Sequence, residues 1–434
     1  MIIFRSTENI NIKTTDGTLI KYSGTKKPSG MVSKDIYVTT LDDFNDLKNV
    51  FSSVGKNYKA KSIGESKFRN IQVFPKELGI SNINEREALY NLNFKYKVES
   101  LRVFNRDKNF LYLDEKKVDL DKQLEFCVKD NITIIILGTP GYSISEMICA
   151  CSAFRIFYKK LKTKFKSVKL DLYLNASENK NFSRDKAIFS NQTFFNKVEP
   201  LSIDMKKFCE YDFFVDAGSV NKKSFYNELP FIDVWLHKLG IDYKSIPNME
   251  KYNSIDLKNY KPNKELKNKL DILKAKGDIL LFHPFSANIK KSIPKEIAVS
   301  LLKQMIVKLP NYTIVSTLKI DSKIDEDRYV DLSKFSKTFL DFSYIISNMS
   351  KIITVNTSTY HVAEAFFIPT IVIFTPNGEN KVYHNYQNSK AIYIEDKSKN
   401  LSKFVFENNA LIFNRFLGWK NLKVSKIIKL LESF

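Results

Sequence analysis

The chain has 434 residues, too many for one ordinary hydrophobic core, so we expect two or three domains. Its formal net charge of +21 comes from lysines in nearly every segment, while a hydrophobic fraction of 43% is typical of a globular protein. Such a basic surface favours anionic partners, but no helix-turn-helix, zinc-finger or aromatic RNA-binding motif accompanies the charge, so we expect no nucleic-acid partner.

Cysteine usage and hydropathy indicate a reducing, aqueous compartment. Cys127, Cys149, Cys151 and Cys209 lack paired CxxC spacing and lie in or beside apolar segments, as reduced core residues do. No apolar run approaches the roughly 18 residues of a membrane span, and the apolar start at residues 1–4 is too short for a signal peptide. We therefore expect a cytoplasmic protein, for which peripheral contact with anionic lipid stays open.

Residues 1–127 alternate short β-type runs with turn residues. The pattern predicts strands at 36–39, 71–74 and 110–113, turns at Gly17 and 27–30, and helices near 40–54 and 84–93. No catalytic constellation stands out here. We interpret this region as an α+β or β-rich accessory domain, with acceptor binding as the functional alternative to a scaffolding role.

The chain then changes to alternating strands and helices. The continuous apolar run at 132–137 is typical of a central parallel strand, and a glycine-proline turn ends it. Apolar residues at helical spacing predict a helix over 145–161, with Glu146 in its first turn. Further predicted elements are strands at 168–174 and 211–216 and an amphipathic helix at 231–240. Residues 128–260 are therefore expected to form a Rossmann-like domain.

A polar, lysine- and asparagine-rich stretch at 241–276 is typical of an interdomain connection. A second alternating block then predicts strands at 279–284, 312–316, 352–355 and 369–374, and helices at 295–308, 340–349 and about 421–433. We expect residues 261–434 to form a second Rossmann-like domain. The predicted fold is thus α/β, with two facing Rossmann-like domains preceded by the smaller accessory domain.

The turn after the strand at 352–355 points to a phosphate site. Ligands of open α/β sheets bind at the carboxyl ends of the strands, where helix N–H groups and the helix dipole favour an anion. Thr357, Ser358 and Thr359 are small enough for close approach and add hydroxyl donors. An ordinary capped helix between two core strands is the alternative interpretation.

Three blocks of sequence extend this pattern over roughly residues 130–434. They are residues 145–155; residues 283–286 (His-Pro-Phe-Ser) with 291–294 (Lys-Ser-Ile-Pro); and residues 356–365 (Asn-Thr-Ser-Thr-Tyr-His-Val-Ala-Glu-Ala), followed by Pro369 and the run 374–376 (Phe-Thr-Pro). In this order the blocks resemble the heptosyltransferase-like glycosyltransferases of family nine, which are inverting enzymes of the two-Rossmann GT-B fold.

The resemblance implies a role for each matching residue. Glu146 stands at the position of the family's general base, and Lys291 would hold the donor diphosphate together with the helix start, with no metal and no cofactor besides the nucleotide-sugar donor. The implied donor-binding residues are His283, Ser286, Asn356, Thr357, Ser358, Thr359 and His361.

Several of these positions depart from the family or have a simpler explanation. Glu146 replaces the family's aspartate, which keeps a carboxylate, and Ser145 replaces its glycine. Asn356 replaces an aspartate and Ser358 a glycine, so the donor sugar stays open. Glu146 could serve only to complement the helix dipole, Lys291 could be a solvated surface residue, and His361 could be a satisfied buried histidine.

The resemblance therefore implies an inverting, metal-independent glycosyltransferase. It would move a heptose or hexose from a nucleotide diphosphate donor to a hydroxyl of a bacterial glycan or protein acceptor. One alternative is a catalytically degenerate GT-B module that binds nucleotide sugar or glycan without turnover. Another is a nucleotide-sugar epimerase of related fold, which would need further acid–base groups in the cleft. The sequence does not indicate an oligomeric state.

Overall fold

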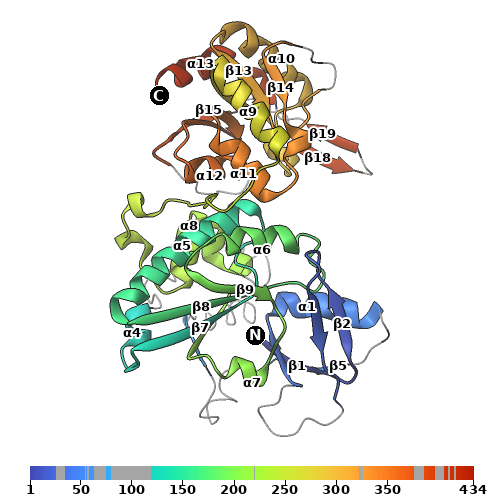
Figure 1. Ribbon diagram of the computed structural model, residues 1–434, viewed down its shortest axis with the longest axis vertical. Helices are drawn as coiled ribbons and strands as arrows, with labels where there is room; N and C mark the ends of the chain where they lie inside the picture. The colour runs from blue at the N-terminus through green and yellow to red at the C-terminus, as the bar shows by residue number, and fades with distance from the viewer. Residues whose placement is uncertain are drawn as a thin grey trace, which may run out of the picture. The chain divides into compact units, whose positions relative to one another are not determined.

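The computed structural model describes residues 1–25, 35–53, 55, 58–62, 75–79, 119–218, 220–321, 324, 326–375, 386–395, 405–408, 411–414 and 417–434. They belong to two compact units, Met1–Lys251 and Tyr252–Phe434 (Figure 1). The predicted turn at 27–30, the strands at 71–74 and 110–113, the helix at 84–93 and Pro376 lie outside the described residues.

A five-stranded parallel sheet forms the centre of the first unit. Its strands lie in the order β6-β11-β7-β8-β9, with bounds Lys76–Glu77 (β6), Asn131–Leu137 (β7), Ser167–Leu174 (β8), Phe195–Pro200 (β9) and Phe213–Asp216 (β11). The predicted central strand is confirmed as β7, whose last four residues are buried. Since the chain runs outward from β7 to β8 and β9 and then returns to β11, the topological switch point lies between β7 and β11.

From residue 119 onward, the α-helices described in this unit are α4 (Leu120–Leu124), α5 (Ile144–Lys164), α6 (Phe182–Ser190), α7 (Met205–Phe208) and α8 (Phe231–Lys238). The predictions at 145–161 and 231–240 are confirmed as α5 and α8, which pack side by side (Figure 1). Between them the rings of Phe154 and Trp235 lie 5.9 Å apart. Cys149 and Cys151 are buried in α5, as expected of core residues.

The accessory region adds an antiparallel sheet to the same unit. Its strand order is β10-β4-β1-β5, with bounds Ile2–Ser6 (β1), Tyr37–Thr39 (β4), Tyr58–Ser62 (β5) and Ile203–Asp204 (β10), beside the hairpin Ile10–Lys13 (β2) and Leu19–Tyr22 (β3) and the predicted helix, α1 (Leu41–Ser53). β10 pairs with β4, and β6 pairs with β11. The domain boundary at residue 127 stays a prediction. In both sheets of this unit, a strand from before residue 127 pairs with a strand from after it.

Asp43 holds α1 against the parallel sheet. Its fully buried carboxylate accepts hydrogen bonds from Thr39 Oγ1 at 2.8 Å, Ser177 Oγ at 3.2 Å and the Ala176 N–H at 3.3 Å. Burial outweighs these donors and raises the pKa of Asp43 to about 6. The contact between α1 and the loop after β8 is therefore sensitive to pH.

We expect the Asp43→Asn variant to lose part of the pH dependence of stability. An unfolded aspartate has a pKa of about 3.9, so protonation of Asp43 favours the folded state. Its contribution is fully present below the unfolded pKa and is lost as the pH rises through about 6. A shift of one pKa unit corresponds to about 1.4 kcal/mol. As the pH rises from 4 to 7, the free energy of unfolding of Asp43→Asn should therefore increase by about 2–3 kcal/mol relative to that of the parent.

Urea unfolding at several pH values measures this difference. Asp121→Asn, which replaces an exposed carboxylate on α4, is the matched control. An Asp43→Asn profile parallel to that of the parent would show that Asp43 does not titrate between folded and unfolded states in this range.

The second unit contains a six-stranded parallel sheet in the order β14-β13-β12-β15-β16-β17. The strands are Asp278–His283 (β12), Tyr312–Ser316 (β13), Tyr329–Asp331 (β14), Lys351–Val355 (β15), Thr370–Phe374 (β16) and Ser389–Tyr393 (β17). This is the 3-2-1-4-5-6 order of a Rossmann fold, with its switch point between β12 and β15. Those two strands are paired, with His283 opposite Thr354. The predicted α/β fold with a β-rich accessory part is confirmed.

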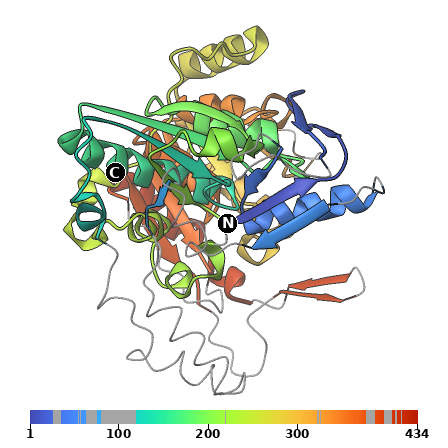
Figure 2. The same cartoon turned by 90° about the horizontal axis from the view of Figure 1, so that it is seen from below.

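The helices of the second unit are α9 (Lys264–Lys276), α10 (Lys295–Lys308), α11 (Phe339–Ser347), α12 (Ser358–Ala365) and α13 (Val424–Glu432), and β18 (Val405–Asn408) with β19 (Leu411–Asn414) forms a separate ribbon (Figure 2). The interpretation of 241–276 as an interdomain connection was wrong for its second half. There α9 buries Leu266, Leu270 and Leu273, while its lysines face outward.

Among the described residues, no helix combines the length and the apolar composition needed to cross a bilayer.

Candidate active site

His283 ends β12 at the carboxyl edge of the second sheet. Its side chain is buried, and Nδ1 lies 2.9 Å from Thr317 Oγ1 in the loop after β13. Burial lowers the pKa of His283 to about 4, so the imidazole is neutral at physiological pH. His283 is therefore a fixed, uncharged polar group. Its partner Thr317 was not predicted, because it is brought close only by the pairing of β12 with β13.

The loop after β12 is closed by two serines. The Ser286 N–H donates to Ser292 Oγ at 2.9 Å, and that hydroxyl donates back to the Ser286 carbonyl at 3.0 Å. Ser286 Oγ also accepts from the Asn288 N–H at 3.3 Å. Lys291 ends the short 3₁₀ turn Ile289–Lys291 inside this closed loop and is partly buried. Ser286 thus shapes the loop that carries Lys291.

The turn after β15 leads into the predicted phosphate helix, α12. Asn356, Thr357 and Ser358 are partly exposed, and the Asn356 N–H extends the ladder to β16 through the Ile373 carbonyl at 3.2 Å. Thr357 is the N-cap, and within the described part of the chain its side chain makes no capping hydrogen bond. In the first turn, the buried Thr359 Oγ1 likewise has no hydrogen-bond partner among the described residues. Backbone and hydroxyl donors therefore converge at this helix start.

Topology brings these two loops to the same place. The loop with Lys291 leaves the end of β12, and the turn at 356–359 leaves the end of β15, the adjacent strand across the switch point. In doubly wound sheets this is where the ligand crevice lies. A cation and a helix N-terminus with the positive end of its dipole therefore start from neighbouring strand ends, an arrangement suited to a diphosphate.

His361 takes part in a buried network behind this helix start. Its side chain is only 3% exposed, and Nδ1 lies 2.8 Å from the Tyr386 hydroxyl. Asn253 Nδ2 donates to that hydroxyl at 3.0 Å, and the Asn253 N–H donates to Glu364 Oε2 at 2.6 Å. This geometry favours the interpretation of His361 as a satisfied buried histidine. Glu364 stands in the motif at 356–365 but was not among the predicted site residues. Its burial is visible only in the structure.

Glu146 lies in the first turn of α5, after β7. Its side chain is 9% exposed, with Oε2 accepting from the Tyr142 N–H at 2.9 Å and Oε1 from Ser143 Oγ at 3.2 Å. Ser143 Oγ in turn accepts from the Glu146 N–H at 3.3 Å. Ser-x-x-Glu is the sequence signature of a helix start, so Ser143 could have been predicted. A carboxylate has about four acceptor positions, so two hydrogen bonds leave room for a proton.

Close backbone packing surrounds Glu146. Gly141 has φ +106°, and a Cβ atom there would lie 2.9 Å from Glu146 Cβ. At the switch point itself, a Cβ on Gly138 would lie 2.9 Å from Thr40 Cγ2, and one on Gly218 would lie 2.9 Å from Thr40 Cβ. The start of α1 therefore packs directly onto the carboxyl edge of the first sheet. The accessory region thus helps to build this edge.

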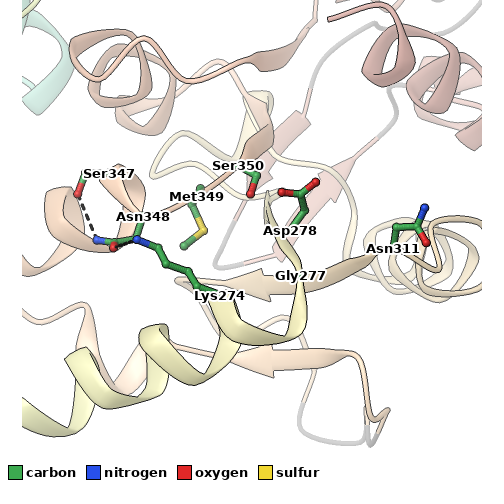
Figure 3. A pocket seen from close by; sticks show the side chains of 8 residues that line it. All are labelled: Lys274, Gly277, Asp278, Asn311, Ser347, Asn348, Met349 and Ser350. Atoms are coloured by element: carbon green, nitrogen blue, oxygen red, sulfur yellow. Dashed lines mark hydrogen bonds between the residues drawn. The ribbon is translucent and has the colours of Figure 1, made fainter.

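A cavity of about 660 Å³ lies at the opposite, amino edge of the second sheet (Figure 3). Asp278 at the start of β12 and Ser350 just before β15 line it, and Lys274 Nζ donates to Asn348 Oδ1 at 2.5 Å beside them (Figure 3). None of the predicted site residues lines this cavity. Among the described residues no group of three or more His, Cys, Asp or Glu side chains is arranged so that it could hold a metal ion, so we assign no metal ligand.

Comparison with known proteins gives structural neighbours only. No family model matches the chain, and no curated protein sequence matches it. Similar solved structures include an ADP-heptose lipopolysaccharide heptosyltransferase II from E. coli (13% identity, 70% of this chain and 98% of that chain, TM-score 0.43). Others are the E. coli heptosyltransferase WaaC with ADP-2-deoxy-2-fluoro heptose (11%, 70% and 99%, 0.43) and a family 9 glycosyl transferase from Veillonella parvula (11%, 70% and 96%, 0.44).

Proposed function

We propose that this chain is an inverting glycosyltransferase that moves a sugar from a nucleotide diphosphate donor to a hydroxyl acceptor. One observation carries the proposal. The two donor-binding motifs, separated by about seventy residues of sequence, leave the ends of the adjacent strands β12 and β15 at the switch point of a 3-2-1-4-5-6 sheet. A motif match by chance would not require this convergence.

The donor diphosphate binds at the start of α12 and at Lys291. As the bond between the anomeric carbon and the phosphate oxygen breaks, its electron pair remains on the diphosphate. The Lys291 ammonium and the oriented N–H groups at residues 357–359 stabilise that charge without a divalent metal. Asn356 and His283 offer uncharged hydrogen-bonding groups to the donor, which suits sugar hydroxyls and leaves heptose and hexose as candidates.

Glu146 serves as the general base. Its carboxylate takes the proton of the acceptor hydroxyl while the acceptor oxygen bonds to the anomeric carbon, so a single displacement inverts the configuration and needs no covalent intermediate. The acceptor is a bacterial glycan or a protein, met in the cytoplasm, with peripheral contact to a membrane as part of the proposal. A degenerate module that binds nucleotide sugar or glycan without turnover is the competing function, favoured by the replacements at Ser145, Asn356 and Ser358.

Nucleotide release tests the proposal against this competitor. The purified protein is incubated with ADP-, UDP- and GDP-linked sugars, with and without a mixture of glycans, and free nucleotide diphosphate is measured. We expect release from one donor, enhanced by an acceptor. Tight binding of a donor without release under any of these conditions would instead identify a degenerate module.

Activity should persist in excess EDTA, because a lysine and a helix N-terminus take the place of a metal ion in this proposal. The measurement is the rate of nucleotide release before and after chelation, with magnesium and manganese added back separately. If chelation abolished release and either ion restored it, Lys291 and α12 would not suffice to stabilise the leaving group.

A further inference from the structure

The cavity at the amino edge of the second sheet is lined almost entirely by polar groups. Its residues come from the ends of α9 and α11, from the loop between α10 and β13, and from the amino ends of β12 and β15 (Figure 3). Among the described lining residues, the buried Met349 supplies the one apolar side chain. The volume of about 660 Å³ is that of a small-molecule site, but such sites are normally lined mainly by apolar groups. The lining therefore suits a ligand that is itself covered with polar groups.

Hydrogen-bond donors and acceptors both line this cavity. Lys274 Nζ donates to Asn348 Oδ1 at 2.5 Å, which holds the ammonium at the cavity wall while its other N–H donors remain for a ligand. The exposed Asp278 carboxylate and the exposed Asn311 amide make no hydrogen bond or ion pair within the described part of the chain. Ser350 Oγ accepts a backbone N–H of β12 at 3.1 Å and can donate its own proton. The cavity thus offers one cation, one anion, an amide and a hydroxyl.

This mixture favours a neutral ligand, although the chain as a whole is basic. Helices of a doubly wound sheet run antiparallel to its strands, so α9 and α11 end at this edge and direct the negative ends of their dipoles toward it. Together with Asp278 they disfavour phosphate and other anions. Lys274 disfavours a cation, and no set of His, Cys, Asp or Glu side chains in the described ranges could hold a metal ion. Hydroxyl groups both donate and accept, and a saccharide presents several of them on a rigid ring.

We propose that this cavity is a binding site for a neutral saccharide. Sugar hydroxyls donate to Asp278 and accept from Lys274 and Asn311, and a C–H face of the ring lies against Met349. Gly277, with φ +136°, lets the chain turn from α9 into β12 at the cavity wall. The site lies at the opposite edge of the sheet from the proposed donor site. The inference therefore goes beyond the proposed function and requires neither a donor nor sugar transfer.

Saccharide binding by the full chain, measured without a donor, tests the site. Saturation-transfer NMR is used to screen neutral mono- and disaccharides, with inorganic phosphate and free amino acids as charged and zwitterionic alternatives. We expect a saccharide to bind the parent protein. Asp278→Ala and Lys274→Ala should each weaken that binding roughly tenfold, the effect of losing a hydrogen bond to a charged group. Asp278→Asn, which keeps an oxygen acceptor, should weaken it only a few-fold.

Asp271→Ala and Lys276→Ala are the matched controls, because they remove exposed charges of α9 that do not line the cavity, and both should bind saccharide like the parent. Equal saccharide affinity of Asp278→Ala, Lys274→Ala and the parent would overturn the site, as would the absence of any saccharide binding by the parent up to about 10 mM. Binding of phosphate or an amino acid in place of a saccharide would also overturn it.

Nucleotide release from the donor, measured without added glycan, should be the same in all these variants and the parent. Saccharide binding that depends on Asp278 and Lys274, in a protein that releases no nucleotide, would uphold the site while the proposed transferase function fails. Nucleotide release without saccharide binding at the cavity would leave the transferase function standing and overturn the site.

Discussion

Glu146→Gln should turn over donor and acceptor roughly 10²–10⁴-fold more slowly than the parent, the usual effect of losing a general base. Glutamine preserves the size of the side chain and one oxygen acceptor but cannot take a proton. Donor affinity, measured by calorimetry, should be nearly unchanged, because the proposed donor-binding residues belong to the second unit. Glu146→Asp keeps the carboxylate and should retain measurable activity.

The capping role of Glu146 calls for a specific control. Its side chain also accepts from Ser143 Oγ and from the Tyr142 N–H at the start of α5. Ser143→Ala disturbs this helix start and should cost about 0.5–2 kcal/mol of stability, but it retains the base. If Ser143→Ala reduced turnover as strongly as Glu146→Gln, the role of Glu146 would be structural.

Turnover of Glu146→Gln within a few-fold of the parent would mean that the base lies elsewhere. Asp216 and Asp233, two carboxylates of the same unit, would then be tested, but both have partners in the structure. Asp216 Oδ2 lies 2.9 Å from the Met1 ammonium, and Asp233 Oδ1 lies 2.7 Å from Lys251 Nζ. Either carboxylate would have to exchange an ion pair for the acceptor hydroxyl.

Lys291→Ala should weaken binding of nucleotide diphosphate by about 1–3 kcal/mol, as expected for a lost charge-assisted hydrogen bond. Isothermal titration calorimetry with the nucleoside diphosphate alone measures this loss without the sugar. Because a cation in water is screened by salt, the loss should shrink as the ionic strength rises.

Two variants separate the charge of Lys291 from other causes. Lys303→Ala removes an exposed lysine of α10 and controls for the general effect of the basic surface. Ser292→Ala opens the hydrogen-bonded loop around Lys291 but keeps the ammonium, so it should weaken binding less. Equal affinity of Lys291→Ala and the parent would remove Lys291 from the diphosphate site.

Local periodicity in the sequence was enough to predict many elements of the two Rossmann-like sheets. The apolar run of β7 and the helical spacing in α10 each depend on residues close together in the chain, so their patterns are visible without a partner. The same reasoning placed the turn at 357–359 after a buried strand. α9 was missed because its three buried leucines stand among many lysines, so that the segment has a polar composition and its apolar face is not evident. The short strands β14 and β17 were missed because most of their residues are only partly buried.

Which of these residues act together was decided only by tertiary structure. Strand order in a parallel sheet depends on crossovers that no local pattern encodes, and it is this order that brings the loop of Lys291 next to the turn at 357–359. The packing of Thr40 on Gly138, which carries α1 toward Glu146, joins residues about a hundred positions apart. Sequence determined the chemistry available at each position. The long-range packing of sheets and helices determined which groups share a site, because contact energies between distant segments appear only when the chain has folded.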